Sequence, residues 1–315
     1  MRSRSYAVLQ APSTLGLESD GVDELAERLI ELGLARDIGA RIAARLSVPP
    51  KQSAPDPETG VLNAQAIAAW SPRLADAVGA VFDAGEFPVV LGGDCTIVLG
   101  SMLACRRRGR YGLLFIDGNA DFFQPDAEPH GEGASMDLAF VTGHGPKLLT
   151  DLEGRAPIVR PEDTVAFAYR DHDDQKEYGS QPLPSDLKAI DLPAVRERGI
   201  EVAARDAVAH LTRAGLDGFF IHVDADCLDD AVMPAVVRRA RSVPDGSAQV
   251  TMAWSRWGRA SPAQSALPRP VSWAYTAVGS RRAKNSRATL VPTQAGQAGD
   301  TSKRRASVAS VMVGP

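Results

Sequence analysis

Three short apolar runs in this chain each end abruptly in acidic residues. The runs and the residues that follow them are Phe87–Leu91 before Gly92-Gly93-Asp94-Cys95, Leu113–Ile116 before Asp117 and Asp121, and Phe219–Val223 before Asp224 and Asp226. A continuous apolar run of this length is typical of a strand buried in a parallel sheet. In open α/β sheets, ligands bind in the crevice beyond the carboxyl ends of the strands. The sequence therefore predicts that three strands deliver acids to one shared, cation-binding site.

The rest of the first 236 residues alternates between strand-like and helix-like patterns. We expect further strands at Tyr6–Leu9 and Thr164–Tyr169, and helices at Gly21–Leu46, Leu62–Ala84, Thr96–Arg108 and Glu201–Ala214. Strands that alternate with helices predict a largely parallel sheet with helices on both faces. The fold class is therefore α/β.

The pattern stops beyond Pro234, and the charge changes with it. Residues 237–315 contain 13 Lys and Arg but only 2 Asp and Glu, whereas the whole chain has a net charge of -4. We interpret residues 1–236 as one α/β domain and residues 237–315 as an atypical basic segment. A change of reading frame near residue 236 explains the abrupt transition; a disordered basic tail and a small irregular domain are the alternatives.

Several classes of protein do not fit the sequence. No apolar run approaches the roughly 18–20 residues that cross a bilayer, and the first residues lack the apolar core of a signal peptide. Three cysteines do not form a disulfide framework, so we expect a reducing, cytoplasmic location. Phosphate-loop, dinucleotide and serine-hydrolase motifs are missing, and the basic clusters lack interleaved aromatic residues. We expect neither a nucleic acid nor a membrane as partner.

The acids at the strand ends suit a metal centre. Asp224 and Asp226 are two residues apart and point to the same side of an extended strand end, and Asp117 and Asp121 can converge across a turn. Four carboxylates in one crevice repel each other unless cations lie between them. Hard dications such as Mg²⁺ and Mn²⁺ prefer carboxylate oxygens, and two of them can hold and activate a water. The alternative is that these aspartates are only helix caps and turn formers.

The three segments VVLGGDC, FIDGNADFF and HVDADCLDD resemble the GGDH, DAHxD and SxDxDxxDP motifs of the arginase–agmatinase ureohydrolases. The resemblance covers residues 6 to about 236. It implies a three-layer αβα sandwich, a homo-oligomer and a centre of two manganese ions. It also implies a small cationic guanidino substrate that is hydrolysed to an amine and urea by a metal-bound hydroxide.

Residue by residue, the resemblance gives metal-ligand roles to Asp117, Asp121, Asp224 and Asp226. Two further ligand positions differ, because Cys95 and Asn119 stand where the family has histidines. A thiolate is soft and suits Zn²⁺ better than Mn²⁺, and an asparagine offers only a neutral amide oxygen. We therefore expect Mn²⁺ as cofactor, with two ions per chain in the family and one or none here.

The family's substrate-side histidine, in an HGMP-like segment, aligns without gaps with Ala134. His144 and Glu132 are the candidate catalytic residues, with His130 as a further nearby histidine. His222 lies inside an apolar run and is expected to be a satisfied buried residue.

Three functions compete. The first is a metal-dependent hydrolase of linear amidines, intact or impaired. The second is a catalytically degenerate ureohydrolase-like scaffold or binding protein, favoured by Asn119, Ala134 and the atypical segment. The third, a one-metal deacetylase of related fold, is disfavoured because a histidine-rich active site is missing.

Overall fold

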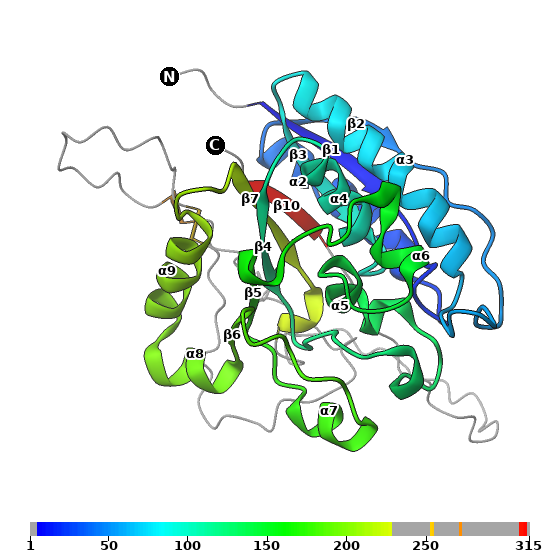
Figure 1. The fold of residues 1–315 in the computed structure, drawn as a ribbon. Helices are drawn as coiled ribbons and strands as arrows, with labels where there is room; N and C mark the ends of the chain where they lie inside the picture. The colour runs from blue at the N-terminus through cyan, green and yellow to red at the C-terminus, as the bar shows by residue number, and fades with distance from the viewer. Residues whose placement is uncertain (1–4, 229–252, 255–270, 273–308, 314–315) are drawn as a thin grey trace, which may run out of the picture. The chain divides into compact units, whose positions relative to one another are not determined.

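A computed structural model describes residues 5–228, 253–254, 271–272 and 309–313 (Figure 1). The chain divides into two units, residues 1–240 with 304–315, and residues 241–303. In the second unit, the described strands β8 (Ala253–Trp254) and β9 (Val271–Ser272) pair antiparallel. Most of the atypical segment 237–315 lies outside the described residues, and so does the transition near residue 236. The interpretation of this segment stays a prediction.

The first unit is built on a sheet of eight strands in the order β2-β1-β3-β10-β7-β4-β5-β6. The strands are β1 (Tyr6–Ala11), β2 (Ala40–Arg45), β3 (Phe87–Gly92), β4 (Tyr111–Ile116), β5 (Thr164–Phe167), β6 (Lys188–Ile190), β7 (Gly218–Val223) and β10 (Ala309–Val313). Neighbouring strands run parallel except at β10, which pairs antiparallel with both β3 and β7. The order brings β3, β7 and β4 close together around the centre of the sheet.

Helices cover both faces of this sheet. They are α1 (Leu25–Glu31), α2 (Leu34–Asp37), α3 (Ala64–Asp83), α4 (Ile97–Arg106), α5 (Asp137–Val141), α6 (Lys147–Thr150), α7 (His172–Tyr178), α8 (Leu192–Arg198) and α9 (Ile200–Leu211). Leu113 and Phe115 of β4 pack into the core under α3, α4 and α5, whereas Leu114 between them packs toward α8 and α9. In Figure 1, α3 and α4 lie on one side of the sheet and α8 and α9 on the other. The fold is the predicted three-layer αβα sandwich.

Close packing of α3 on α4 depends on a glycine. A Cβ atom added at Gly100 of α4 would lie 2.7 Å from the carbonyl oxygen of Ser71 and 2.8 Å from the Cβ of Leu74, both in α3. Real side chains do not approach so closely, so any larger residue here would push the two helices apart. This contact holds α4, and with it the loop that leads from β3, against the rest of the core.

The prediction that Gly21–Leu46 is mostly helix misses a strand near its end. Residues Ala40–Arg45 form β2, an edge strand that pairs parallel with β1. Gly39 has a φ of +65°, which ends the helical region, and the arginines of ARIAAR suit an exposed sheet edge. The short edge strand β6 was not predicted either.

None of the helices in the described part of the chain combines the length and the apolar character that a bilayer crossing requires.

Candidate metal centre

Strands β3, β4 and β7 deliver the predicted acids to the carboxyl edge of the sheet. Asp117 and Asp121 are each 1% exposed, Asp224 is 3% exposed and Asp226 is 9% exposed. Charged carboxylates are rarely buried so deeply without a partner of opposite charge. The acids at these strand ends are therefore more than surface turn formers.

Asp117, Asp224 and Asp226 form the first donor group. Each offers a carboxylate oxygen, and these three oxygens lie within 4.8 Å of one another. Oδ1 of Asp117 accepts the backbone N–H of Asn119 at 2.7 Å, but its Oδ2 is buried and has no hydrogen-bond partner among the described residues. Oδ1 of Asp224 accepts the backbone N–H of Asp226 at 2.8 Å. A buried carboxylate oxygen without a hydrogen-bond partner, in a group of converging carboxylates, fits the binding of a cation.

Asn119 interacts with this group through its amide nitrogen. Its Nδ2 donates to Oδ2 of Asp226 at 2.5 Å, and the backbone N–H of Gly118 donates to Oδ1 of Asp226 at 2.8 Å. A Cβ at Gly118 would lie 2.6 Å from the carbonyl oxygen of Asp226, so this approach requires glycine. Through these two contacts Asn119 and Gly118 position the carboxylate of Asp226.

Cys95 lies against Asp224 at the end of β3. Its Sγ donates to Oδ2 of Asp224 at 3.0 Å, and its side chain packs with Leu17 and Ala134. Ala134, which aligns with the family's substrate-side histidine, is thus a small apolar neighbour of Cys95.

Asp94 holds the loop that carries Cys95. Its carboxylate accepts the hydroxyl of Ser13 at 2.6 Å and the backbone N–H of Thr96 at 2.9 Å. Asp94 is fully buried. The second glycine of the GGDC sequence allows this arrangement, because a Cβ at Gly93 would overlap the carbonyl oxygen of Ser13.

Asp137 is a further acid of the site that the sequence analysis missed. It is fully buried at the start of α5, where its Oδ1 accepts the backbone N–H of Leu138 at 2.9 Å. Its Oδ2 has no partner among the described residues. Burial raises the pKa of Asp137, and the negative charges of Asp121 and Asp224 raise it further. In the sequence it looks like an ordinary helix-capping aspartate, and only the fold brings it to the cluster.

The electrostatics of the cluster favour a cation. Burial is the largest cause that raises the pKa of Asp117, Asp224 and Cys95, and the neighbouring carboxylates raise all three further. No lysine or arginine of the described chain forms an ion pair with Asp117, Asp137, Asp224 or Asp226. A bound dication would reverse each of these pKa shifts. The oxygen-rich donor set fits a hard metal ion such as Mn²⁺.

His222 is buried as predicted, but the prediction that it is satisfied is wrong. It is fully buried in β7, and its ring stacks on Phe115 with centroids 4.5 Å apart and planes 5° apart. Neither ring nitrogen has a hydrogen-bond partner among the described residues. Burial lowers the pKa of His222 to about 3. A ligand atom of His222 also lies within 4.8 Å of ligand atoms of Cys95 and Asp224.

The two candidate catalytic residues, His144 and Glu132, lie on loops. His144 is half-buried, with Nδ1 3.2 Å from the hydroxyl of Thr142 and its ring 5.1 Å from that of Phe122. Glu132 is 8% exposed, and its Oε1 accepts the backbone N–H of Glu18 at 2.8 Å. His130, the further histidine, pairs with the carboxylate of Glu18 at 3.5 Å.

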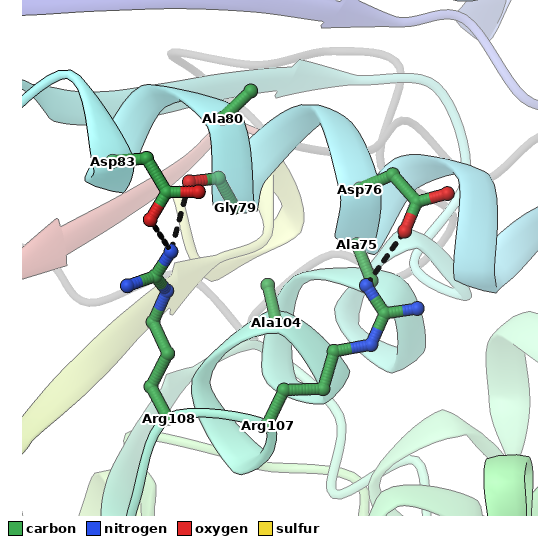
Figure 2. A pocket seen from close by; sticks show the side chains of 8 residues that line it. All are labelled: Ala75, Asp76, Gly79, Ala80, Asp83, Ala104, Arg107 and Arg108. Carbon is green, nitrogen blue, oxygen red and sulfur yellow. Dashed lines mark hydrogen bonds and ion pairs between the residues drawn. The ribbon is translucent and has the colours of Figure 1, made fainter.

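A hollow of about 460 Å³ lies between α3 and α4, away from this centre. Figure 2 shows Arg107 directed at Asp76, with an ion-pair distance of 2.8 Å, and Arg108 directed at Asp83. Helix α4 begins two residues after Cys95 and ends at Arg106, so its length of about 15 Å separates the hollow from the acids. The arginines of the hollow are paired, and we do not assign it to the site.

Comparison with known proteins agrees with the motifs. A sequence profile of the arginase family matches residues 23–242. The arginase of Staphylococcus aureus strain MRSA252 is 26% identical over 250 residues, which cover 76% of this chain and 80% of that protein. The arginase of Bacillus caldovelox is 30% identical over 176 residues, covering 55% of this chain and 58% of the relative.

Solved structures show the same fold. The arginase of Bacillus caldovelox superimposes with a TM-score of 0.65 at 24% identity, covering 75% of this chain and 81% of that one. The formimidoylglutamase of Bacillus subtilis gives a TM-score of 0.55 at 14% identity, with coverage of 76% and 70%. With the profile match over more than half of its length, the chain belongs to the arginase family.

Proposed function

We propose that this protein is a metal-dependent hydrolase of linear amidines, which converts a guanidino compound and water to an amine and urea. One observation carries the proposal: the buried oxygens of Asp117, Asp224 and Asp226 converge within 4.8 Å, and Oδ2 of Asp117 has no partner among the described residues. The proposal is also supported by the chain's membership of the arginase family and by its similarity to bacterial arginases.

The metal of this proposal is Mn²⁺, held by Asp117, Asp121, Asp224 and Asp226. When bound, such an ion activates a water at neutral pH and thereby supplies the nucleophile. In the overall reaction a bond forms between the water oxygen and the guanidinium carbon, and the bond from that carbon to the substituted nitrogen breaks. The two protons of the water pass to the leaving nitrogen, so that the products are urea and an alkylammonium ion.

The chain's own residues attract the substrate and move the proton. The concentration of aspartates gives the centre a negative field, which favours a cationic guanidinium end. Since Ala134 cannot carry a proton, we assign that role to a neighbouring loop residue. Glu132, two positions earlier in the chain, is our first candidate, and His144 beside Phe122 is the second.

The direct test is urea release from arginine, agmatine and 4-guanidinobutyrate by the Mn²⁺-loaded chain. We expect urea from at least one of them and none after Asp117→Asn, with the surface variant Asp206→Asn as matched control. A chain that retains Mn²⁺ but releases no urea from any of the three would contradict the proposal.

A second candidate is a scaffold or binding protein that keeps the fold without the chemistry. Two hydrogen bonds favour it, from Cys95 to Asp224 and from Asn119 to Asp226. Cys95 and Asn119 replace the family's two histidines, and as hydrogen-bond donors they partner acids that would otherwise bind the metal. Metal content separates the two candidates, since a scaffold closed by these bonds needs no ion.

We also propose that the protein is a cytoplasmic homo-oligomer. Sedimentation velocity of the purified chain tests the assembly, and cell fractionation tests the location.

A further inference from the structure

Cys95, His222 and Asp224 form a second donor group within the centre. Their ligand atoms lie within 4.8 Å of one another, and all three side chains are buried. Cys95 and Asp224 are already in contact at 3.0 Å. A tetrahedral zinc site brings sulfur, nitrogen and oxygen ligands to roughly 3.5 Å from each other, so small side-chain movements are enough to close the group around one ion.

His222 is the residue that points to a ligand. It is fully buried, and both ring nitrogens are without a hydrogen-bond partner among the described residues. Buried polar atoms are nearly always paired, and a histidine that only filled space would be better replaced by an apolar residue. Stacking on Phe115 holds the ring plane fixed, which leaves the nitrogens at the ring edge free to meet an ion.

The strand geometry explains how His222 reaches the group. His222 and Asp224 are two residues apart in and just after β7, and alternate residues of a strand share a face. The same alternation places Phe220 in the core under α3 and α4. Cys95 lies two residues before α4, with its sulfur within 4.8 Å of ligand atoms of His222 and Asp224. In the ureohydrolase pattern SxDxDxxDP the residue at this strand position is a serine, so His222 adds a donor that the pattern lacks.

We propose that Cys95, His222 and Asp224 bind a borderline-soft divalent ion, Zn²⁺ before Mn²⁺, with the imidazole of His222 as a ligand. Asp224 lies between this position and the all-carboxylate position of Asp117 and Asp226, because its Oδ2 faces Cys95 and its Oδ1 faces the Asp226 segment. Thiolate and imidazole suit Zn²⁺, whereas carboxylates alone suit Mn²⁺. On binding, the thiol of Cys95 loses its proton to solvent and its sulfur bonds to the ion. The inference rests on the proposed function only in treating the acid cluster as a metal centre.

The test uses Co²⁺ as a spectroscopic substitute for Zn²⁺ on the full-length chain after chelator treatment. We expect a thiolate-to-cobalt charge-transfer band in the near ultraviolet that saturates at one equivalent and disappears when Zn²⁺ is added. The Cys95→Ser variant should lose the band. Cys227→Ser and Cys105→Ser should keep it, which excludes the other two thiols of the chain.

His222→Phe is the decisive variant, because phenylalanine can keep the stack on Phe115. We expect its zinc affinity to fall at least about 100-fold, since outer-shell partners alone are worth about 10–100-fold. If this variant does not fold, X-ray absorption of the zinc-loaded wild type gives the answer, with one sulfur and one imidazole per zinc expected.

The absence of a cobalt–thiolate band in the wild type, a band that survives Cys95→Ser, or zinc without an imidazole ligand would overturn the inference. Its failure is distinguishable from failure of the proposed function. Mn²⁺ binding and urea release test the carboxylate position, and the cobalt spectrum reports only the thiolate position.

Discussion

Two buried carboxylates lie at opposite edges of the same sheet, and they are stabilised differently. Asp163 immediately precedes β5 at the amino edge, whereas Asp117 immediately follows β4 at the carboxyl edge. Asp163 accepts Nε of Arg110 at 2.6 Å and Nη2 of Arg110 at 2.9 Å, and it also pairs with Arg213. Asp117 accepts one backbone N–H and leaves its other oxygen without a partner among the described residues.

The difference separates a structural acid from an acid that needs an ion. At the amino edge the chain supplies its own counter-ions, Arg110 and Arg213. The carboxylate of Asp163 thereby links the start of β5 to the residue before β4 and to the segment that follows α9. At the carboxyl edge the counter-ion must come from solution. Burial alone therefore does not identify a metal ligand; a buried carboxylate oxygen with neither a cationic nor a hydrogen-bond partner points to one.

The largest effect that sharpens this contrast is expected for Asp224→Asn. Asp224 belongs to both donor groups, so its loss removes a carboxylate from both metal positions at once. We expect urea release to fall on the order of 1000-fold or more, because a metal ion contributes several kcal/mol to transition-state stabilisation. Activity of this variant within tenfold of the wild type would show that the cluster does not hold the ion that matters.

At the amino edge, Asp163→Ala should instead destabilise the fold and leave metal content unchanged. It leaves Arg110 and Arg213 without their shared carboxylate, and their side chains are 39% and 33% exposed. We expect the free energy of unfolding to fall by about 2–3 kcal/mol, somewhat less than for a fully buried pair. Denaturant titration measures the loss, and elemental analysis checks the metal.

Asn119→His restores an imidazole at the carboxyl edge and should tighten Mn²⁺ binding roughly tenfold, or about 1.4 kcal/mol. The substitution also removes the hydrogen bond from Nδ2 to Asp226. A matched variant, Asn119→Ala, removes the same bond without adding a ligand and should not tighten binding. Equal Mn²⁺ affinity for the two variants would mean that position 119 is not near an ion.

The smallest effect concerns an acid that is paired at the surface. The hydrogen bonds from Lys188 and then Arg198 lower the pKa of Asp206 below its ordinary value of 3.8. A carboxyl group whose pKa is lower in the folded than in the unfolded chain stabilises the fold at any pH above its unfolded-state pKa. This stabilisation is lost as the pH falls through the folded-state pKa. Asp206→Asn should therefore lower the free energy of unfolding by less than about 1 kcal/mol at pH 7, and by progressively less as the pH falls below 3.8. If the substitution lowered the free energy of unfolding by the same amount in acid, the loss could not come from the lowered pKa of Asp206.

Much of the architecture could be predicted because the strand ends carry a local signal. Each of β3, β4 and β7 is a short apolar run that stops at acids, and such runs are recognisable without knowing the fold. The failures occurred where no such signal exists. The segment Ala40–Arg45 is a charged edge strand that follows a helix with only Gly39 to mark the change.

Two residues of the site were harder to predict, because their roles depend on which other segments of the chain they meet. Asp137 looks like a helix cap until α5 is placed against the acids. His222 looks like a satisfied core residue until its neighbours are known and none of those described is found to pair with it. Asp137 meets Asp121 and Asp224 from two strand ends, and His222 meets Phe115 and Cys95 from other segments, which no local pattern can report.

The most direct test of the account is the number of divalent ions per chain, measured by elemental analysis after purification with Mn²⁺ and Zn²⁺ and removal of free metal. The account predicts bound metal in the wild type, with Zn²⁺ lost in His222→Phe and Mn²⁺ lost in Asp117→Asn. Asp163→Ala, which removes an equally buried carboxylate at the opposite edge of the sheet, should retain both. A wild-type chain that binds neither ion would contradict the central claim that the acids at the carboxyl edge form a metal centre.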